Sequence, residues 1–269
     1  MSLVRAYMAG AAAVVKRDFL IFTSYRLRFL SEMVSAMLGV MLFYYVSRLV
    51  KGGSFETSDA YFSYAVIGLA VVQVLTAALV LLPLALRQEL VAGTFERFLV
   101  SPLGPIYGLL AMAVFPFLSA LVSALLMIVF AALAFGMPME WSTAPLALPA
   151  ALLGAVAFLP FAVLLTGAVF VVKQVGAGAG LLVMLVAIVG GVFFPVALLH
   201  DWIEWTSNVQ PLTPAADLLR NLAVGTPIDS AWGAVGRLAL FAAVLLPVSV
   251  LLLRACLRYG QRRGTVLEY

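Results

Sequence analysis

The sequence is poor in the residues that soluble proteins use to face water. Of 269 residues, 16 are Lys or Arg and 12 are Asp or Glu, while 65% are hydrophobic. A soluble domain carries about 25% charged residues, and a chain this apolar cannot cover its own core with polar surface. The composition therefore excludes a soluble enzyme, a secreted disulfide scaffold and a disordered tail.

Reactive residues are equally scarce. With Cys256 as the single cysteine, an intrachain disulfide and a cysteine-rich metal site are both excluded. With His200 as the single histidine, the chain cannot form the H-E-x-x-H zinc motif. The G-x-x-x-x-G-K-[ST] motif is absent, so the chain does not bind ATP through a P-loop. We expect no enzyme activity and no catalytic, cofactor-binding or metal-ligating residues in this chain.

Long uncharged runs place the backbone in lipid, because a spanning helix needs roughly 20 apolar residues. The sequence predicts an all-α polytopic membrane protein with six transmembrane helices in a domain 29–256, followed by a cytoplasmic tail 257–269. The six runs cover about 29–50, 61–86, 106–135, 146–172, from the glycine cluster 176–180 to 199, and 232–253.

Basic residues indicate how the chain is oriented. With six spans and a cytoplasmic N-terminus, 12 of the 16 Lys and Arg residues lie inside, and the net charges are +12−5 = +7 inside and +4−7 = −3 outside. We therefore expect both termini in the cytoplasm and the chain in the cytoplasmic membrane. The basic character then reflects topology and anionic lipid, and no nucleic-acid partner is needed to explain it.

Residues 1–28 combine apolar residues with cationic ends, including Lys16 and Arg17. This pattern is typical of an amphipathic helix lying at the cytoplasmic headgroup level. The alternative is a seventh, failed span, but the three charges at 16–18 make full insertion costly.

The cytoplasmic loop 87–102 contains an apolar stripe. Read as a helix, it places Val91, Phe95, Phe98 and Leu99 on one face, and Thr94 is a good N-cap. We expect this face to meet the cytoplasm and to dock into a groove on a soluble partner. The alternative is that the loop folds back onto the ends of the protein's own spans, and burial of 94–100 there would contradict the docking hypothesis.

The external stretch 200–230 predicts a re-entrant or interfacial half-helix. Thr213 reads as its N-cap and Pro214 as its first position, and about ten residues give ~15 Å, half a bilayer. Asp217 and Arg220 stand at i, i+3 and are expected to pair.

Two further patterns concern packing and transport. Gly176 and Gly180 allow close helix approach, either within one subunit or at a dimer seam. Gln73 is the deepest polar side chain in a span, and a carboxylate at that depth, which ion-coupled carriers use, is lacking. Candidate residues for a substrate path are Tyr44, Tyr45, Gln73, Phe193 and Phe194. The aromatic ones are alternatively interface anchors.

The loop also carries a motif. It is similar to the R-x-E-x-x-x-G-T-x-E-x-L-x-x-[ST]-P cytoplasmic pattern of type-2 ABC exporter permeases, with Phe98 in place of the usual leucine. The matching residues are Arg87, Glu89, Gly93, Thr94, Glu96, Ser101 and Pro102. The order of segments resembles this family over nearly the whole chain.

Later segments extend the resemblance. The sequence Phe43-Tyr-Tyr-Val-Ser-Arg-Leu-Val ends the first span, and Gly191-Val-Phe-Phe-Pro-Val resembles the family's fifth span. Asn208-Val-Gln-Pro-Leu-Thr-Pro resembles its external re-entrant segment, where N-P-x-T is common, but Gln210 is an extra residue. The start of the external helix therefore stays open.

The resemblance implies a permease that works as a pair, with two separate ATPase subunits whose P-loops bind ATP and Mg. A homodimer is favoured over a heterodimer. The loop would be the coupling helix seated in the ATPase. Its contact residues would be Glu89, Gly93, Thr94, Phe95, Glu96, Arg97, Phe98, Leu99, Ser101 and Pro102. The outer gate would contain Pro211, Thr213, Pro214, Asp217 and Arg220.

The resemblance implies export, and the aromatic, nearly uncharged interior favours a hydrophobic or amphipathic cargo such as a drug, lipid or glycolipid. A polysaccharide or lipid-linked glycan stays open, because aromatic side chains also stack on sugars. The competing class is an ATP-independent carrier or membrane scaffold, which would leave the stripe at 95, 98 and 99 without a purpose.

Overall fold

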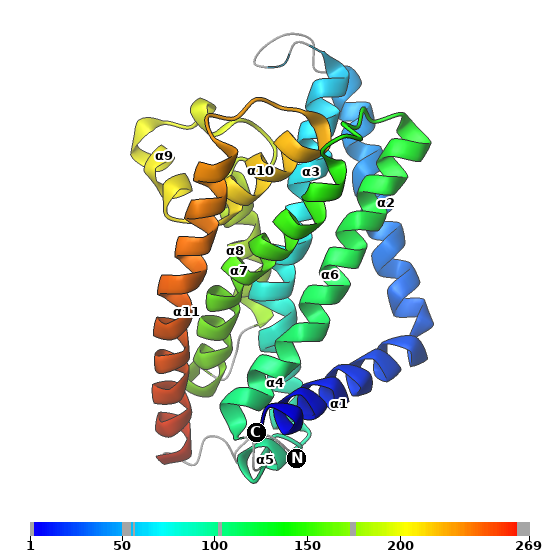
Figure 1. Ribbon diagram of the computed structural model, residues 1–269. Helices are drawn as coiled ribbons and strands as arrows, with labels where there is room; N and C mark the ends of the chain where they lie inside the picture. Colours follow the sequence, from blue (N-terminus) through cyan, green and yellow to red (C-terminus); the bar gives the residue numbers. More distant parts are fainter. Residues whose placement is uncertain (1–2, 50–54, 56, 102–103, 173–175, 263–269) are drawn as a thin grey trace.

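A computed structural model of the chain describes residues 3–49, 55, 57–101, 104–172 and 176–262, and within these ranges the regular elements are all helical. The long helices run alongside one another in a bundle, and α1 (Leu3–Ser24) lies obliquely across one end of it (Figure 1). The start of α1 and the last turn of α11 (Ala231–Arg262) lie at that same end (Figure 1). We call it the α1 end, and the opposite end is the α10 end.

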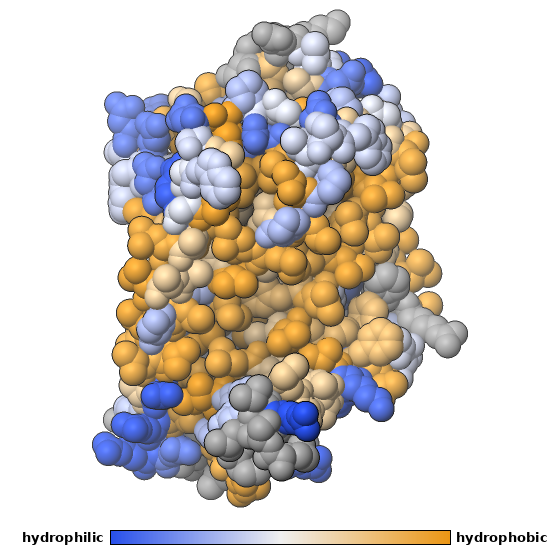
Figure 2. Space-filling model, in the orientation of Figure 1, coloured by the Kyte–Doolittle hydropathy of each residue, from blue (hydrophilic) through white to orange (hydrophobic). Residues whose placement is uncertain are grey.

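Five of the described helices are long and apolar enough to cross a bilayer. They are α2 (Arg26–Leu49), the continuous helix Ser58–Val91, α6 (Pro105–Phe135), α7 (Ala144–Val172) and α11. Figure 2 shows apolar side chains as a broad belt across the visible face of the molecule, with hydrophilic residues gathered at the two ends. The chain is an all-α polytopic membrane protein, as its composition predicts.

The predicted fifth span is wrong in its length. Helix α8 (Gly176–Val189) has 14 residues, which at 1.5 Å per residue is about 21 Å, short of the ~30 Å hydrocarbon core. It ends because Gly191 adopts a positive φ of 72°, and the chain then turns into the short helix η2 (Val196–Leu198). The apolar run to 199 hides this turn.

The continuous helix Ser58–Val91 forms the centre of the bundle. It consists of α3 (Ser58–Thr76), a π-helical turn η1 (Ala77–Leu81) and α4 (Leu82–Val91). Its Ala77 and Ala78 are fully buried. Pro83 follows the turn, and proline lacks the N–H that would bond four residues back. A π turn relieves this mismatch without breaking the helix.

Helix α1 is separate from α2, because the chain breaks its helical course at Tyr25. Two aromatic pairs attach α1 to α6. The rings of Tyr7 and Tyr107 lie 4.7 Å apart edge to face, and those of Phe22 and Phe115 lie 5.5 Å apart. The predicted N-terminal helix is thus confirmed as a helix, and its place at the membrane surface stays a prediction.

At the α10 end, α9 (Asp201–Asn208) and α10 (Leu212–Val224) cross the bundle (Figure 1). The predicted half-helix is confirmed as α10, which ends at Gly225 with a φ of 77°. It begins at Leu212, however, so Thr213 lies inside the helix and is not its N-cap. Pro211 takes the preceding position, and no side chain caps the helix there.

The glycines of this region differ in whether they allow close packing within the chain. A Cβ on Gly190 would stand 2.2 Å from a methyl carbon of Leu212, so Gly190 is needed for contact within the chain. A Cβ on Gly178 or Gly180 would meet nothing within 4 Å. The side chain position of Gly176 lies outside the residues whose packing is described.

Candidate functional site

The predicted coupling segment divides at Gly93. Residues up to Val91 belong to α4, and the chain then turns at Gly93, whose φ is 66°. The short helix α5 (Glu96–Leu99) follows. Thr94 does not cap it, because its hydroxyl donates to the side chain and the carbonyl of Glu89. The end of the motif at Pro102 lies outside the described residues.

The orientation predicted for Phe95 is wrong. Its side chain is 1% exposed, and its ring lies 5.5 Å from that of Phe170 in the last turn of α7 and 6.0 Å from that of Phe98. Phe98 in turn packs on Gly108 of α6, where an added Cβ would stand 2.2 Å from the Phe98 ring. Of the predicted stripe, Phe95 is buried, Phe98 and Leu99 are half-buried and Val91 is 61% exposed. The two phenylalanines therefore pack on the protein's own bundle, which is the alternative that the sequence left open.

A different set of residues on this loop faces outward. Ala92, Gly93, Glu96, Arg97 and Val100 are exposed, and Val100 is 83% exposed. Leu99 and Ser101 are half-buried. The surface that α5 offers to a partner is therefore a charged pair with a small apolar edge. The aromatic stripe lies on the opposite side and attaches the loop to α6 and α7.

A third attachment joins the loop to α1. One guanidinium nitrogen of Arg17 lies 2.8 Å from a carboxylate oxygen of Glu89, and another lies 2.8 Å from Asp18. The backbone carbonyl oxygen of Glu89 accepts from the backbone N–H groups of Thr94 and Phe95. Burial raises the pKa of Asp18, and its bond to Arg17 opposes this rise. The loop thus contacts α1, α6 and α7 together, which the sequence-based reading did not anticipate.

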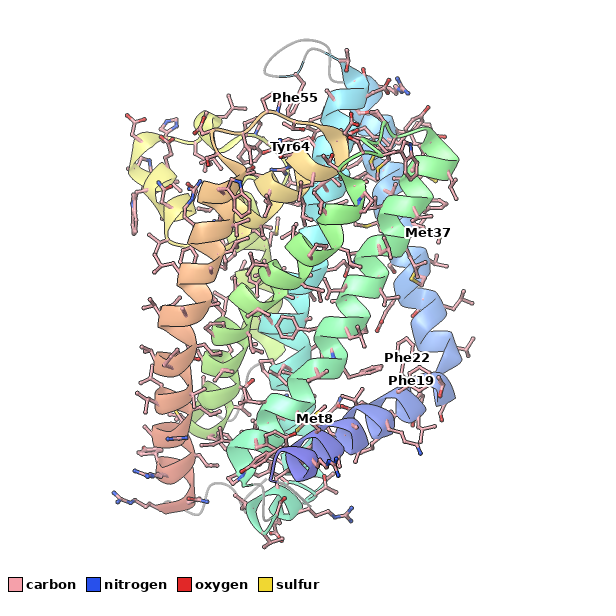
Figure 3. The ribbon with its side chains drawn as sticks, viewed as in Figure 1. Met8, Phe19, Phe22, Met37, Phe55 and Tyr64 are labelled. Atoms are coloured by element: carbon pink, nitrogen blue, oxygen red, sulfur yellow. The ribbon has the colours of Figure 1, made fainter. Side chains whose placement is uncertain are left out.

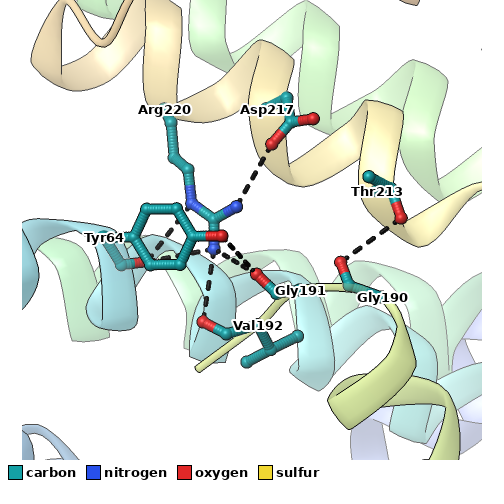
Figure 4. Close-up of polar contacts among 7 residues, drawn as sticks. All are labelled: Tyr64, Gly190, Gly191, Val192, Thr213, Asp217 and Arg220. Carbon is teal, nitrogen blue, oxygen red and sulfur yellow. Dashed lines mark hydrogen bonds and ion pairs between the residues drawn. The ribbon is translucent and has the colours of Figure 1, made fainter. Parts of the chain in front are cut away.

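At the α10 end, Arg220 is the centre of a buried polar cluster. Its side chain is 2% exposed and donates to the carbonyl oxygens of Tyr64, Gly191 and Val192, at 3.0 to 3.3 Å (Figure 4). The guanidinium also lies 3.4 Å from the centroid of the Tyr64 ring. By donating to the carbonyls of Gly191 and Val192, which follow the end of α8, Arg220 stabilises the turn that comes after this helix.

The predicted pairing of Asp217 with Arg220 is confirmed, with 3.2 Å between a carboxylate oxygen and a guanidinium nitrogen. Burial raises the pKa of Asp217, and the positive charge of Arg220 opposes this rise. Burial lowers the pKa of Arg220, opposed by Tyr64 and Asp217, but arginine stays protonated in proteins. The cluster therefore holds a charged arginine beside a carboxylate that burial makes less acidic.

The other predicted gate residues support the same junction. The Thr213 hydroxyl donates to the carbonyl of Gly190 at 3.3 Å, and the Tyr64 hydroxyl donates to Gly191 at 2.7 Å. Pro211 and Pro214 are buried. Together these contacts fix α10 and α3 against the end of α8.

Sequence reasoning missed Tyr64 and Gly68 on α3. A Cβ on Gly68 would stand 2.5 Å from the carbonyl oxygen of Val192 and 3.0 Å from the guanidinium of Arg220. A glycine in the middle of an apolar run can indicate such close approach, but it does not identify the partner. The spacing of Asp217 and Arg220 in the sequence predicted that they pair. It gave no indication that Arg220 also bonds to carbonyl groups of other elements.

The five candidate path residues do not converge on one site. Tyr44 packs against Phe62 and Phe135, with ring centroids 5.5 and 4.5 Å away, and Tyr45 is 56% exposed. Phe193 stacks on Phe43 at 5.6 Å, and Phe194 is half-buried. Gln73 lies apart from these, on the wall of a cavity of about 660 Å³ between α2, α3 and α6.

Comparison with known proteins identifies the family to which the chain belongs. The chain matches the family described as ABC-2 family transporter protein over residues 30–251, which is most of its length. No curated protein matches it. The matched range contains the loop with α5, the end of α8 and the Arg220 cluster. The chain therefore belongs to the ABC-2 transporter family and is a membrane subunit of an ABC transporter.

Proposed function

We propose that the chain is the permease of an ATP-driven exporter that moves a hydrophobic or amphipathic substrate outward across the cytoplasmic membrane. Two copies of the chain would form the conduit, and two ABC ATPase subunits would bind ATP and Mg beneath them. The α1 end, with both ends of the described chain, would face the cytoplasm, as the distribution of basic residues favours.

The observation that carries this proposal is the attachment of α5. A segment that transmits movement must be rigid with respect to the helices that it moves, because packed interfaces hold discrete arrangements. Phe95 contacts Phe170 of α7, and Phe98 contacts α6 at Gly108. The exposed Glu96 and Arg97 remain for the ATPase, so a push on α5 reaches both spans directly.

The experiment is reconstitution of the purified chain with its ATPase in proteoliposomes, followed by measurement of ATP-dependent movement of labelled amphiphiles. The proposal predicts movement that requires both proteins and stops with a non-hydrolysable nucleotide. Movement by the chain alone would instead support the ATP-independent carrier.

A further inference from the structure

A groove lies between α1, α2, α6 and the continuous helix Ser58–Val91. It has two connected parts. The upper part, of about 660 Å³, lies inside the apolar belt, and the lower part, of about 350 Å³, lies at the α1 end. Residues common to both parts include Phe22, Glu32 and Phe115. Volumes of 300–1,000 Å³ are typical of small-molecule sites.

The upper part suits an apolar tail. Its wall includes Leu69, Val72, Leu118 and Val122, and the last of these and Leu118 are about half exposed, at 46% and 49%. The groove therefore opens sideways toward lipid. Gln73 and four serines of α2 and α6, at positions 31, 35, 119 and 123, add hydroxyl and amide groups within the belt.

The lower part suits a positively charged head. Its described walls include the carboxylates of Asp18 and Glu89 and the guanidinium of Arg17. Arg17 is shared between these two carboxylates, with 2.8 Å to each, so one positive charge faces two negative ones. Figure 3 shows Phe22 on the last turns of α1, beside the break before α2, where the two parts meet.

We propose that this groove binds an amphipathic cation from the bilayer leaflet at the α1 end, with its head beside Asp18 and Arg17 and its tail along α3 and α6. The excess of carboxylates attracts a cationic head and disfavours an anionic one, and the lateral opening admits a molecule that is already in the bilayer. This inference deepens the proposed function, because it names the class of molecule that the transporter would receive.

Binding is measured without the ATPase, so that failure of this inference and failure of ATP-driven export are distinguishable. The purified chain in phosphatidylcholine nanodiscs is titrated with dodecyltrimethylammonium, dodecyl sulfate and dodecylphosphocholine by calorimetry, with empty nanodiscs as the baseline. We expect saturable binding of the cation beyond the baseline and at least tenfold weaker binding of the sulfate.

Two variants locate the site. A Cβ on Gly39 meets nothing within 4 Å, so Gly39→Leu fills the upper groove without strain and should weaken binding of the cation at least tenfold. Its matched control is Gly236→Leu on α11, where a Cβ also meets nothing within 4 Å and binding should be unchanged. Asp18→Asn should weaken cation binding about fivefold by removing a charge near the head, while Glu204→Gln on α9 should not.

Four results would overturn the inference. The first three are no saturable heat beyond that of empty nanodiscs, equal binding of the cation and the sulfate, and full binding in Gly39→Leu. Equal binding of dodecylphosphocholine would identify a general phospholipid site and would equally contradict the preference for a cation.

Discussion

The rings of Phe95 and Phe170 lie 5.5 Å apart and join the loop between α4 and α6 to the last turn of α7. The contact is buried, since Phe95 is 1% exposed. The Phe95 ring therefore packs inside the protein, although the sequence predicted that it would contact the ATPase. We therefore expect movement of α5 to be transmitted to α7 through this contact.

Replacing Phe95 with a smaller side chain should reduce ATP-dependent transport without preventing assembly with the ATPase. Phe95→Leu keeps an apolar side chain in the buried site but removes the aromatic contact, so we expect ATPase copurification to be retained and ATP-dependent transport to fall several-fold. Phe130→Leu is the control, because it removes a comparable ring contact with Phe135 far from the loop. Unchanged transport in Phe95→Leu would contradict the proposal that the contact between Phe95 and Phe170 transmits movement.

Reversing the exposed charges of Glu96 and Arg97 should weaken binding of the ATPase, in contrast to Phe95→Leu. Glu96 and Arg97 are exposed on α5, so the double change Glu96→Lys/Arg97→Glu should leave the fold stable and greatly reduce ATPase copurification, because like charges placed across an interface repel. Glu204→Lys at the α10 end serves as the control. Normal recovery of the ATPase with the double variant would exclude this surface as the contact.

Loss of Arg220 should be strongly destabilising. Arg220→Met removes the donor that reaches the carbonyls of Tyr64 and Val192, and a buried acceptor left unsatisfied costs about 1–3 kcal/mol. Thermal unfolding in detergent should show a clear fall in melting temperature. Arg258→Met, at an exposed position of α11, should leave the melting temperature close to that of the native chain.

The close approach at Gly68 gives a paired test on glycine. Gly68→Ala places a Cβ 2.5 Å from the Val192 carbonyl oxygen, and overpacking of this kind costs about 1–3 kcal/mol. Gly39→Ala meets nothing within 4 Å and should be neutral or stabilising by up to about 1 kcal/mol, since alanine is the better helix former. Equal melting temperatures of the two variants would contradict the packing described at Gly68.

Lowering the pH should raise the stability of the native chain relative to that of the Asp217→Asn variant. Because burial raises the pKa of Asp217 above its unfolded value, the folded state binds the proton more tightly, and stability from this group rises as the pH falls through the folded pKa. The melting temperature of the native chain relative to Asp217→Asn should therefore increase from pH 7 toward pH 4.5. A relative decrease would mean that pairing with Arg220 outweighs burial.

The long helices α6 and α7 were predictable because each contains a continuous uncharged run of more than 20 residues. The same signal misled at α8, where residues 190–199 are nearly as apolar as a span. There the positive φ at Gly191 and the donors of Arg220 decide the backbone course, and both depend on residues far away in sequence.

The loop between α4 and α6 shows the same limit at the level of one side chain. The spacing of Phe95, Phe98 and Leu99 predicts that they share a face, and the contact between Phe95 and Phe98 agrees with this. Periodicity does not say whether such a face meets a partner or the protein's own bundle. Gly108 on α6, which makes room for the Phe98 ring, belongs to another element and carries no signal in the loop itself.

The central claim is that α5 delivers the movement of a separate ATPase to this bundle. It is tested most directly by placing a photoactivatable cross-linking residue at Arg97 and, in a second variant, at Trp202 of α9, in membranes that contain both proteins. The account predicts an ATPase cross-link from position 97 and none from position 202. A cross-link from 202, or none from 97 in a complex that still hydrolyses ATP and transports, would contradict it.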